Sequence, residues 1–158
     1  MQTFLPYADF ETSAQSLDYR RLGKQRVEAM QILKAILGIP RKDGKPYKGW
    51  LNHPCSVMWK DYPEALKHYS NIMIEEWKRR GYNNNMDLYE VDVNNIEMPW
   101  WIGEDRIHKS HRSNLLRKDF EYYSALGWTE NPEDPYVWHD VEGKLYEQHV
   151  GTGTRVYI

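Results

Sequence analysis

Four cations lie within seven consecutive positions of the chain, at Arg20, Arg21, Lys24 and Arg26. Side chains of like charge at this density repel one another unless solvent or anions stand nearby. One interpretation is a solvated face of a helix. The other is a phosphate-binding site, because the planar guanidinium of arginine holds two phosphate oxygens at once.

Two carboxylates lie at the edges of the same segment. Asp18 precedes the cations and Glu28 follows them. Each can pair with a neighbouring arginine, which is a structural role, and each is also a candidate catalytic acid or base. The sequence leaves both interpretations open for both residues.

A second polar segment covers residues 107–118 and combines histidines, small polar residues and cations. On a helix, His108, His111 or Arg112, and Leu115 share one face. Zinc is an alternative, but no cysteine pair or glutamate-rich segment accompanies the histidines, so we expect no metal and no cofactor. The segment instead predicts contacts with phosphates and base edges. His111 is also a candidate general base.

A third segment, around Asn52 to Cys55, has the composition of a helix start. Asn52 is a favourable N-cap and Pro54 suits the first turn, which predicts a short helix through Lys60. Cys55 and His53 are not a convincing nucleophile pair, because neighbouring residues at a helix start do not face each other. An apolar cysteine more often packs in a core.

The elements that position these segments are predicted to be mostly helical. A capping box of Thr12 and Gln15 starts the first helix. Apolar residues then recur at helical spacing from Gln25 onward. Gly38 stops this pattern, and a polar, basic loop follows over residues 38–51.

Two further long helices are predicted, one from Pro63 to Gly81 and one from about Glu104 to Tyr123. Residues 136–148 predict a hairpin with its turn at Glu142-Gly143. We therefore expect a mainly α fold, a single compact bundle of three long helices with short helices, long loops and a small C-terminal β-hairpin. Its predicted core includes Val27, Met30, Leu66, Tyr69, Met73, Trp77 and Leu115.

Length and composition restrict the class of protein. The 158 residues suit one domain over residues 1–158, and 41% hydrophobic with 28% charged residues is typical of a globular protein. No apolar run is long enough for a membrane span, and the first ten residues do not resemble a secretory signal. One cysteine fits the reducing cytosol, so we expect a cytoplasmic protein.

The net charge of −2 argues against a protein that simply coats DNA. The basic residues nevertheless cluster in the segments described above, and a local basic face can bind phosphates.

These segments, in this order, resemble the pyrimidine dimer DNA glycosylase family, which is endonuclease V-like. The likeness extends over about residues 1–140. Uncharacterised bacterial and phage relatives share several of the motifs. The motifs that carry the resemblance are Tyr19-Arg20-Arg21-Leu22, Leu22 to Glu28, Asn52-His53-Pro54, Leu66 to Tyr82 and His108 to Arg117.

The resemblance implies a DNA glycosylase that acts on damaged or modified pyrimidines and then nicks the strand. In the family, the nucleophile is the α-amine of an N-terminal threonine, a glutamate of the first helix assists, and arginines hold DNA phosphates. An α-amine ordinarily titrates at about pH 8, so part of it is neutral at working pH.

This sequence differs from the family pattern at two positions. Gln2 is bulky and should hinder removal of Met1, and Arg21 stands where the family has its glutamate. The resemblance therefore leaves the amine of Met1 as the candidate nucleophile and Asp18 or Glu28 as the candidate acid or base.

The leading interpretation is a DNA glycosylase, with abasic-site lyase activity as its associated step. The alternative is a non-catalytic protein that binds or sequesters a nucleotide in the same basic pocket, so the partner is DNA or a nucleotide and not a membrane. The catalytic candidates are Met1, Asp18, Glu28 and His111. The candidate phosphate-binding residues are Arg20, Arg21, Lys24, Arg26, Asn52, His53, His108, Ser110, Arg112, Arg117 and Lys118.

Overall fold

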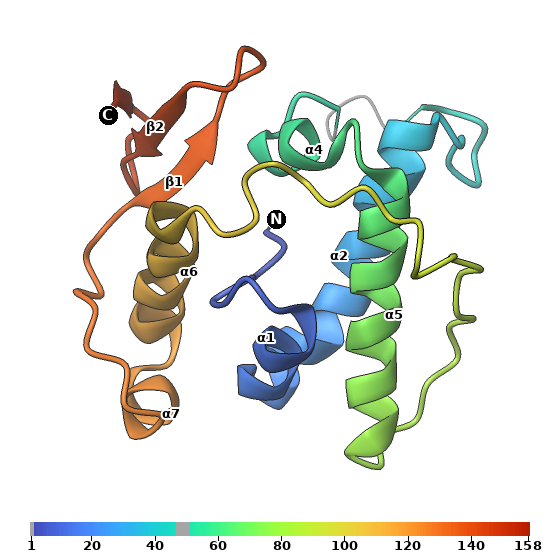
Figure 1. The fold of residues 1–158 in the computed structure, drawn as a ribbon, viewed down its shortest axis with the longest axis horizontal. Helices are drawn as coiled ribbons and strands as arrows, with labels where there is room; N and C mark the ends of the chain where they lie inside the picture. The colour runs from blue at the N-terminus through green and yellow to red at the C-terminus, as the bar shows by residue number, and fades with distance from the viewer. Residues whose placement is uncertain (1, 47–50) are drawn as a thin grey trace.

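The structure is a computed structural model that describes residues 2–46 and 51–158. It confirms the mainly α prediction (Figure 1). The helices are α1 (Phe10–Ser16), α2 (Tyr19–Leu37), α4 (Pro54–Trp59), α5 (Pro63–Arg79), α6 (Asp105–Lys118) and α7 (Phe120–Ala125). The strands are β1 (Tyr136–His139), β2 (Leu145–Gln148) and β3 (Arg155–Tyr157).

The predicted bundle of three long helices is not confirmed. The helices α2 and α5 pack against each other, whereas α6 lies on the far side of the chain's first residues (Figure 1). Within the described residues, none of the helices is long and apolar enough to cross a membrane.

The expected first helix is divided into α1 and α2 by an extended residue, Leu17 (φ −73°, ψ 139°). It also begins earlier than predicted, because Asp9 rather than Thr12 is its cap: the Asp9 carboxylate accepts from the Thr12 amide at 2.8 Å. The expected third helix is likewise divided, at Asp119, into α6 and α7.

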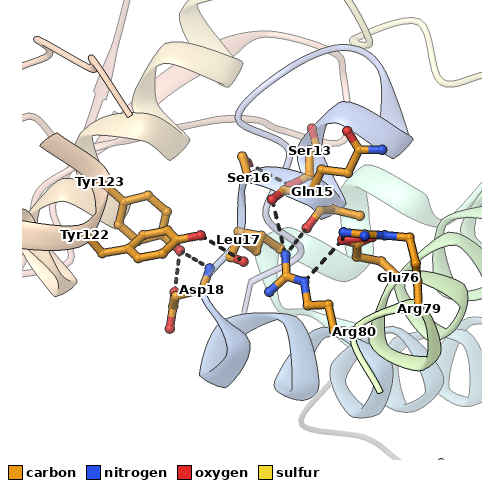
Figure 2. Close-up of polar contacts among 11 residues, drawn as sticks. Ser13, Gln15, Ser16, Leu17, Asp18, Glu76, Arg79, Arg80, Tyr122 and Tyr123 are labelled. Atoms are coloured by element: carbon orange, nitrogen blue, oxygen red, sulfur yellow. Dashed lines mark hydrogen bonds and ion pairs between the residues drawn. The ribbon is translucent and has the colours of Figure 1, made fainter. Parts of the chain in front are cut away.

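Figure 2 shows the polar contacts that stabilise the break before α2. The hydroxyl of Tyr123 accepts from the Asp18 amide at 3.1 Å and donates to the Asp18 carboxylate. The Arg80 guanidinium donates to the carbonyls of Ala14 and Gln15, at 3.2 Å each. The backbone groups that the interrupted helix leaves unpaired are thus satisfied by side chains of α7 and of the residue that ends α5.

The core contains most of the residues predicted for it. Leu66, Tyr69, Met73 and Leu115 are fully buried, while Met30 and Trp77 are half-buried. The prediction for Val27 is wrong, since this side chain is 40% exposed. The inward face of α2 is formed by Leu22, Ala29, Ile32 and Leu33, and Val27 points to the opposite side of the helix.

The predicted C-terminal hairpin is present, and a third strand extends it. The sheet is antiparallel with the order β1-β2-β3, and Trp138 pairs with Tyr146. Gly143 adopts a positive φ of 84° in the turn, which few other residues tolerate. The strand β1 contacts both α4 and α6, so the sheet joins the two sides of the molecule.

Candidate functional site

Residues 2–6, which we call the N-terminal segment, are buried between α6 on one side and α2, α4 and α5 on the other (Figure 1). The indole of Trp59 donates to the Thr3 hydroxyl at 2.8 Å, and the Tyr69 hydroxyl donates to the Phe4 carbonyl at 2.8 Å. Side chains of the helices thus satisfy polar groups of this segment, which belongs to no sheet.

Gln25 of α2 provides the backbone contacts that a neighbouring strand would otherwise supply. Its side-chain Nε2 donates to the Gln2 carbonyl at 3.0 Å, and its Oε1 accepts from the Phe4 amide at 2.9 Å. The Tyr69 hydroxyl, whose one hydrogen is shared with the Phe4 carbonyl, also lies 2.7 Å from the Gln25 Oε1, and the Gln25 Nε2 donates to Glu28 at 3.2 Å. Gln25 is only 1% exposed, so these bonds fix the segment in a buried environment.

Helix α6 holds the N-terminal segment from the other side, through three residues that were predicted to contact phosphates or perform catalysis. The Leu5 amide donates to His111 Nδ1 at 2.9 Å, and His108 Nδ1 lies 2.8 Å from the Leu5 carbonyl. Arg112 donates to the Pro6 carbonyl at 2.6 Å. These contacts engage all three side chains with the protein's own backbone.

The environment of His111 favours a structural role over that of a general base. Burial, and next the neighbouring His108, lower the pKa of His111 to about 3. The ring is therefore neutral, and because Nδ1 accepts from the Leu5 amide, the proton is on Nε2. Nδ1 is then engaged by the Leu5 amide, and Nε2 carries the proton but has no hydrogen-bond partner among the described residues, so neither nitrogen can accept a proton from a ligand.

Burial of neutral His111 predicts that the protein loses stability in mild acid. Unfolding exposes the ring and restores its ordinary pKa of about 6.5, so the unfolded state binds the extra proton first. The contribution of the neutral His111 ring to the free energy of unfolding is fully present above about pH 6.5. As the pH falls from there toward the folded pKa of about 3, the free energy of unfolding should decrease by up to about 1.4 kcal/mol per pH unit.

Urea unfolding of the wild type and of His111→Asn across this pH range measures the effect. The variant should be less stable at neutral pH and should show a shallower decline in acid. Equal pH dependence of the two proteins would contradict this account of His111.

A cavity of about 270 Å³ opens where the N-terminal segment meets α2 and α6, and we call it the basic cavity. The Gln2 backbone nitrogen lies 3.4 Å from Glu28 Oε2 in this cavity. The first described residue of the chain, a carboxylate and three cations therefore share one site. The residues that line it are Gln2, Phe4, Arg21, Lys24, Gln25, Glu28, Lys118 and Tyr136.

The cations of the basic cavity come from two segments that are far apart in the sequence, α2 and the end of α6. Burial lowers the pKa of Lys118, and the nearby charges of Arg21, Arg117 and Lys24 lower it further. Cations that destabilise one another in this way favour an anion between them. This electrostatic arrangement suits a phosphate.

Asp18 lies outside the basic cavity but orients one of its cations. Its carboxylate is 3.3 Å from Arg21 Nη1 and also accepts from Tyr123. Burial, and then the hydrogen bond to Asp18, raise the pKa of Tyr123, which therefore remains a protonated donor. Of the two carboxylates, Glu28 lines the cavity and Asp18 occupies the N-cap position of α2.

Two cations of the first segment point away from the basic cavity. Arg20 is exposed, and its Nε donates to the Tyr19 hydroxyl at 3.0 Å. Arg26 donates to Asn84 at 2.7 Å and its guanidinium stacks on Trp77. The predicted cation cluster is thus distributed over different sides of one helix.

The remaining candidates also lie outside the cavity lining. His53, and not Asn52, has the side chain that caps α4: its Nδ1 accepts from the Cys55 amide at 3.1 Å. Ser110 donates to the Ile107 carbonyl, and Arg117 donates to the Pro132 carbonyl. Asn52 is exposed. Met1 lies outside the described residues.

Cys55 packs in the core rather than serving as a nucleophile. Burial raises the pKa of its thiol to about 11, so it is not a thiolate at neutral pH. Its sulfur lies 3.2 Å from the Thr3 hydroxyl. Among residues 2–46 and 51–158, no three His, Cys, Asp or Glu side chains gather as a metal site would require.

Four of the residues that line the cavity are not among those predicted from the sequence: Gln2, Phe4, Gln25 and Tyr136. Gln25 carried a detectable signal, since it is a polar residue on the apolar face of a predicted helix, and a buried amide needs partners. The other three gave none, because their place in the site depends on how distant segments pack.

The fold and the basic cavity define a helical protein whose first residues enter a cavity lined by three cations and a carboxylate. The family model described as pyrimidine dimer DNA glycosylase matches residues 1–90, which is more than half of the 158 residues. The chain belongs to the pyrimidine dimer DNA glycosylase family. No curated protein matches the chain. No solved structure matches it either.

The matched region contains six of the residues that line the basic cavity. They belong to the N-terminal segment and to α2. Lys118 and Tyr136 lie beyond residue 90, so α6 and β1 complete the cavity with residues that the family model does not match.

Proposed function

We propose that the protein is a DNA glycosylase that acts on a damaged or modified pyrimidine and then cleaves the strand at the abasic site. The observation that carries the proposal is the 3.4 Å contact between the Gln2 backbone nitrogen and Glu28 within the basic cavity. Because Met1 is joined to Gln2 by one peptide bond, the proposed nucleophile is the α-amine of Met1.

The proposed reaction uses this amine as a covalent catalyst. Its nitrogen bonds to C1′ of the deoxyribose while the glycosidic bond breaks, and the base leaves with the electron pair of that bond. Loss of the amine proton and opening of the C1′–O4′ bond give an imine. Removal of a proton from C2′ then expels the 3′ phosphate and nicks the strand.

Glu28 is the proposed acid and base for these proton transfers, since its carboxylate lies beside the start of the chain. Arg21, Lys24 and Lys118 are the proposed ligands of the phosphates on either side of the reacting sugar. The three cations line the same cavity as Glu28, so phosphate binding would place C1′ near the amine.

Borohydride trapping tests the proposed function directly. Duplexes that carry a cyclobutane pyrimidine dimer or an abasic site are incubated with the protein and borohydride, which reduces an imine to a stable amine. We expect a protein–DNA adduct that survives denaturation and maps to Met1 by peptide mass spectrometry. A folded protein that yields no adduct with either duplex would contradict the proposal.

A matched control is the same chain with its amine acetylated, which removes the nucleophile and leaves every side chain intact. It should bind the duplexes and give no adduct. Intact mass measured in the same experiment shows whether Met1 is retained.

The nucleotide-binding alternative is favoured by one observation, the aromatic side chains of Phe4 and Tyr136 in the cavity lining. Two rings beside three cations suit a base with its phosphate. Absence of any trapped adduct, together with tight binding of a free pyrimidine nucleotide, would support this function over glycosylase activity.

A further inference from the structure

A second group of aromatic and basic side chains lies on the other side of α2 from the basic cavity. Tyr19, Trp77 and Tyr82 form a continuous row of rings, which we call the aromatic strip. The ring centroids of Trp77 and Tyr82 are 4.4 Å apart, and those of Tyr19 and Tyr82 are 6.2 Å apart. The planes of each pair are tilted by only 32° and 34°.

The inner end of the aromatic strip is fixed against α2. A Cβ atom on Gly23 would lie 2.9 Å from the Trp77 ring, so the indole packs directly on the helix backbone. The Arg26 guanidinium lies 4.3 Å from the centre of the same ring, and the indole nitrogen donates to the Asn83 carbonyl at 2.7 Å. Trp77 is therefore held in one orientation.

The outer end of the strip is open to solvent. Tyr82 is 40% exposed and Tyr19 is 49% exposed. Their only aromatic neighbours within the described residues are each other and Trp77. Two large rings that are ordered by an anchored tryptophan, yet half uncovered, form a surface on which another flat ring can stack.

Cations flank the strip. Arg20 lies 5.7 Å from the Tyr19 ring centre and Arg26 covers Trp77, while Lys24 lies on the side of α2 that lines the basic cavity. Among the described residues, none of these three cations forms a salt bridge with a carboxylate. The surface thus combines stacking rings with cations that form no salt bridge within the described residues.

We propose that the aromatic strip, flanked by Arg20 and Arg26, binds unpaired bases of a DNA strand by stacking. Aromatic side chains interleaved with cations bind single-stranded nucleic acid without strong sequence preference, because every base has a flat face and every nucleotide has a phosphate. Tyr19, Gly23 and Arg26 share one side of α2, while Arg21, Lys24 and Glu28 face the other way. One strand could therefore cross the exposed face of α2 and contact both sites.

The test compares two short single strands with equal numbers of phosphates, one of thymidine and one of tetrahydrofuran units that lack bases. Neither carries an aldehyde, so binding requires no chemistry in the basic cavity, and its result is independent of the trapping experiment. We expect the wild type to prefer the thymidine strand. Tyr82→Leu, which keeps apolar volume but removes the ring, should weaken thymidine binding about 5- to 150-fold, as expected for one lost stacking contact.

Binding of the baseless strand should be unchanged in Tyr82→Leu, because its phosphates meet the same cations. Tyr19→Leu is a second variant, at an exposed position where substitution does not disturb Trp77, and it should show the same selective loss. Phe120→Leu is the matched control, since Phe120 is an exposed aromatic residue (59%) on α7. Equal losses on both strands, no loss on either, or an equal loss in the control would each overturn the proposal.

Discussion

Substitution of Glu28 by glutamine should slow formation of the borohydride-trapped adduct by about 10²- to 10⁴-fold, the usual contribution of one general acid or base. Glutamine has the same shape, and its side-chain oxygen can still accept from the Gln2 backbone nitrogen, which lies 3.4 Å from the carboxylate in the wild type. The substitution therefore removes the charge and the proton-transfer capacity while it keeps the start of the chain in place.

The matched control is Glu75→Gln, because Glu75 is an exposed carboxylate on α5 and does not line the basic cavity. Its adduct should form at the wild-type rate. The Asp18→Asn variant further distinguishes the role of Asp18 from that of Glu28. Since Asp18 contacts Arg21 and Tyr123, loss of its carboxylate should lower the melting temperature and weaken DNA binding. These effects should be larger than its effect on the rate of adduct formation in the bound complex. A normal rate in Glu28→Gln would remove Glu28 from the mechanism.

Gln25→Leu should have the second large effect, on both stability and adduct formation. The substitution leaves the Gln2 carbonyl and the Phe4 amide without their partners in a buried site. Each buried group left unpaired costs about 1–3 kcal/mol, so we expect the free energy of unfolding to fall by about 3 kcal/mol. A typical domain retains a folded majority after such a loss.

The trapping rate of the variant shows whether Gln25 positions the N-terminal segment for the reaction or only stabilises the fold. At a temperature where the variant is folded, the maximal trapping rate should fall more than the affinity for DNA, because Arg21, Lys24 and Lys118 remain in place. Gln25→Glu should recover only part of the loss: its carboxylate can accept from Phe4 and Tyr69 but cannot donate to the Gln2 carbonyl.

The control for Gln25 is Gln31→Leu, the same substitution on the same helix. Gln31 is half-buried and does not line the basic cavity. It should leave the trapping rate unchanged. If Gln25→Leu and Gln31→Leu behave alike, the N-terminal segment is not positioned by this amide.

The sequence predicted the residues of the candidate site unevenly, and the reason lies in what each cation contacts. Arg21, Lys24, Glu28 and Lys118 line the basic cavity, and all four were selected from local charge and helical spacing. His108, His111 and Arg112 were selected on the same basis but bind the backbone of residues 5 and 6. Local sequence composition does not distinguish a cationic side chain that lines a cavity from one that forms a hydrogen bond with a backbone carbonyl.

The secondary-structure elements were also predicted only in part. The spacing of apolar residues predicted α5 and the hairpin of β1 and β2, because these patterns depend on neighbours in the sequence. The breaks at Leu17 and Asp119 were not predicted. The first is stabilised by Tyr123 and Arg80, which lie far along the chain and supply partners for the unpaired backbone groups.

The sequence by itself therefore determined the mainly α class, the family resemblance and the two cation-rich segments, since each is encoded by residue type and spacing. Only the tertiary structure decided which cations share a cavity, that Glu28 rather than Asp18 lines it, and that Gln25 fixes the first residues beside it. The physical reason is that hydrogen bonds and charge repulsion act over a few ångströms, and the chain brings residues 2, 28 and 118 within that range only when it folds.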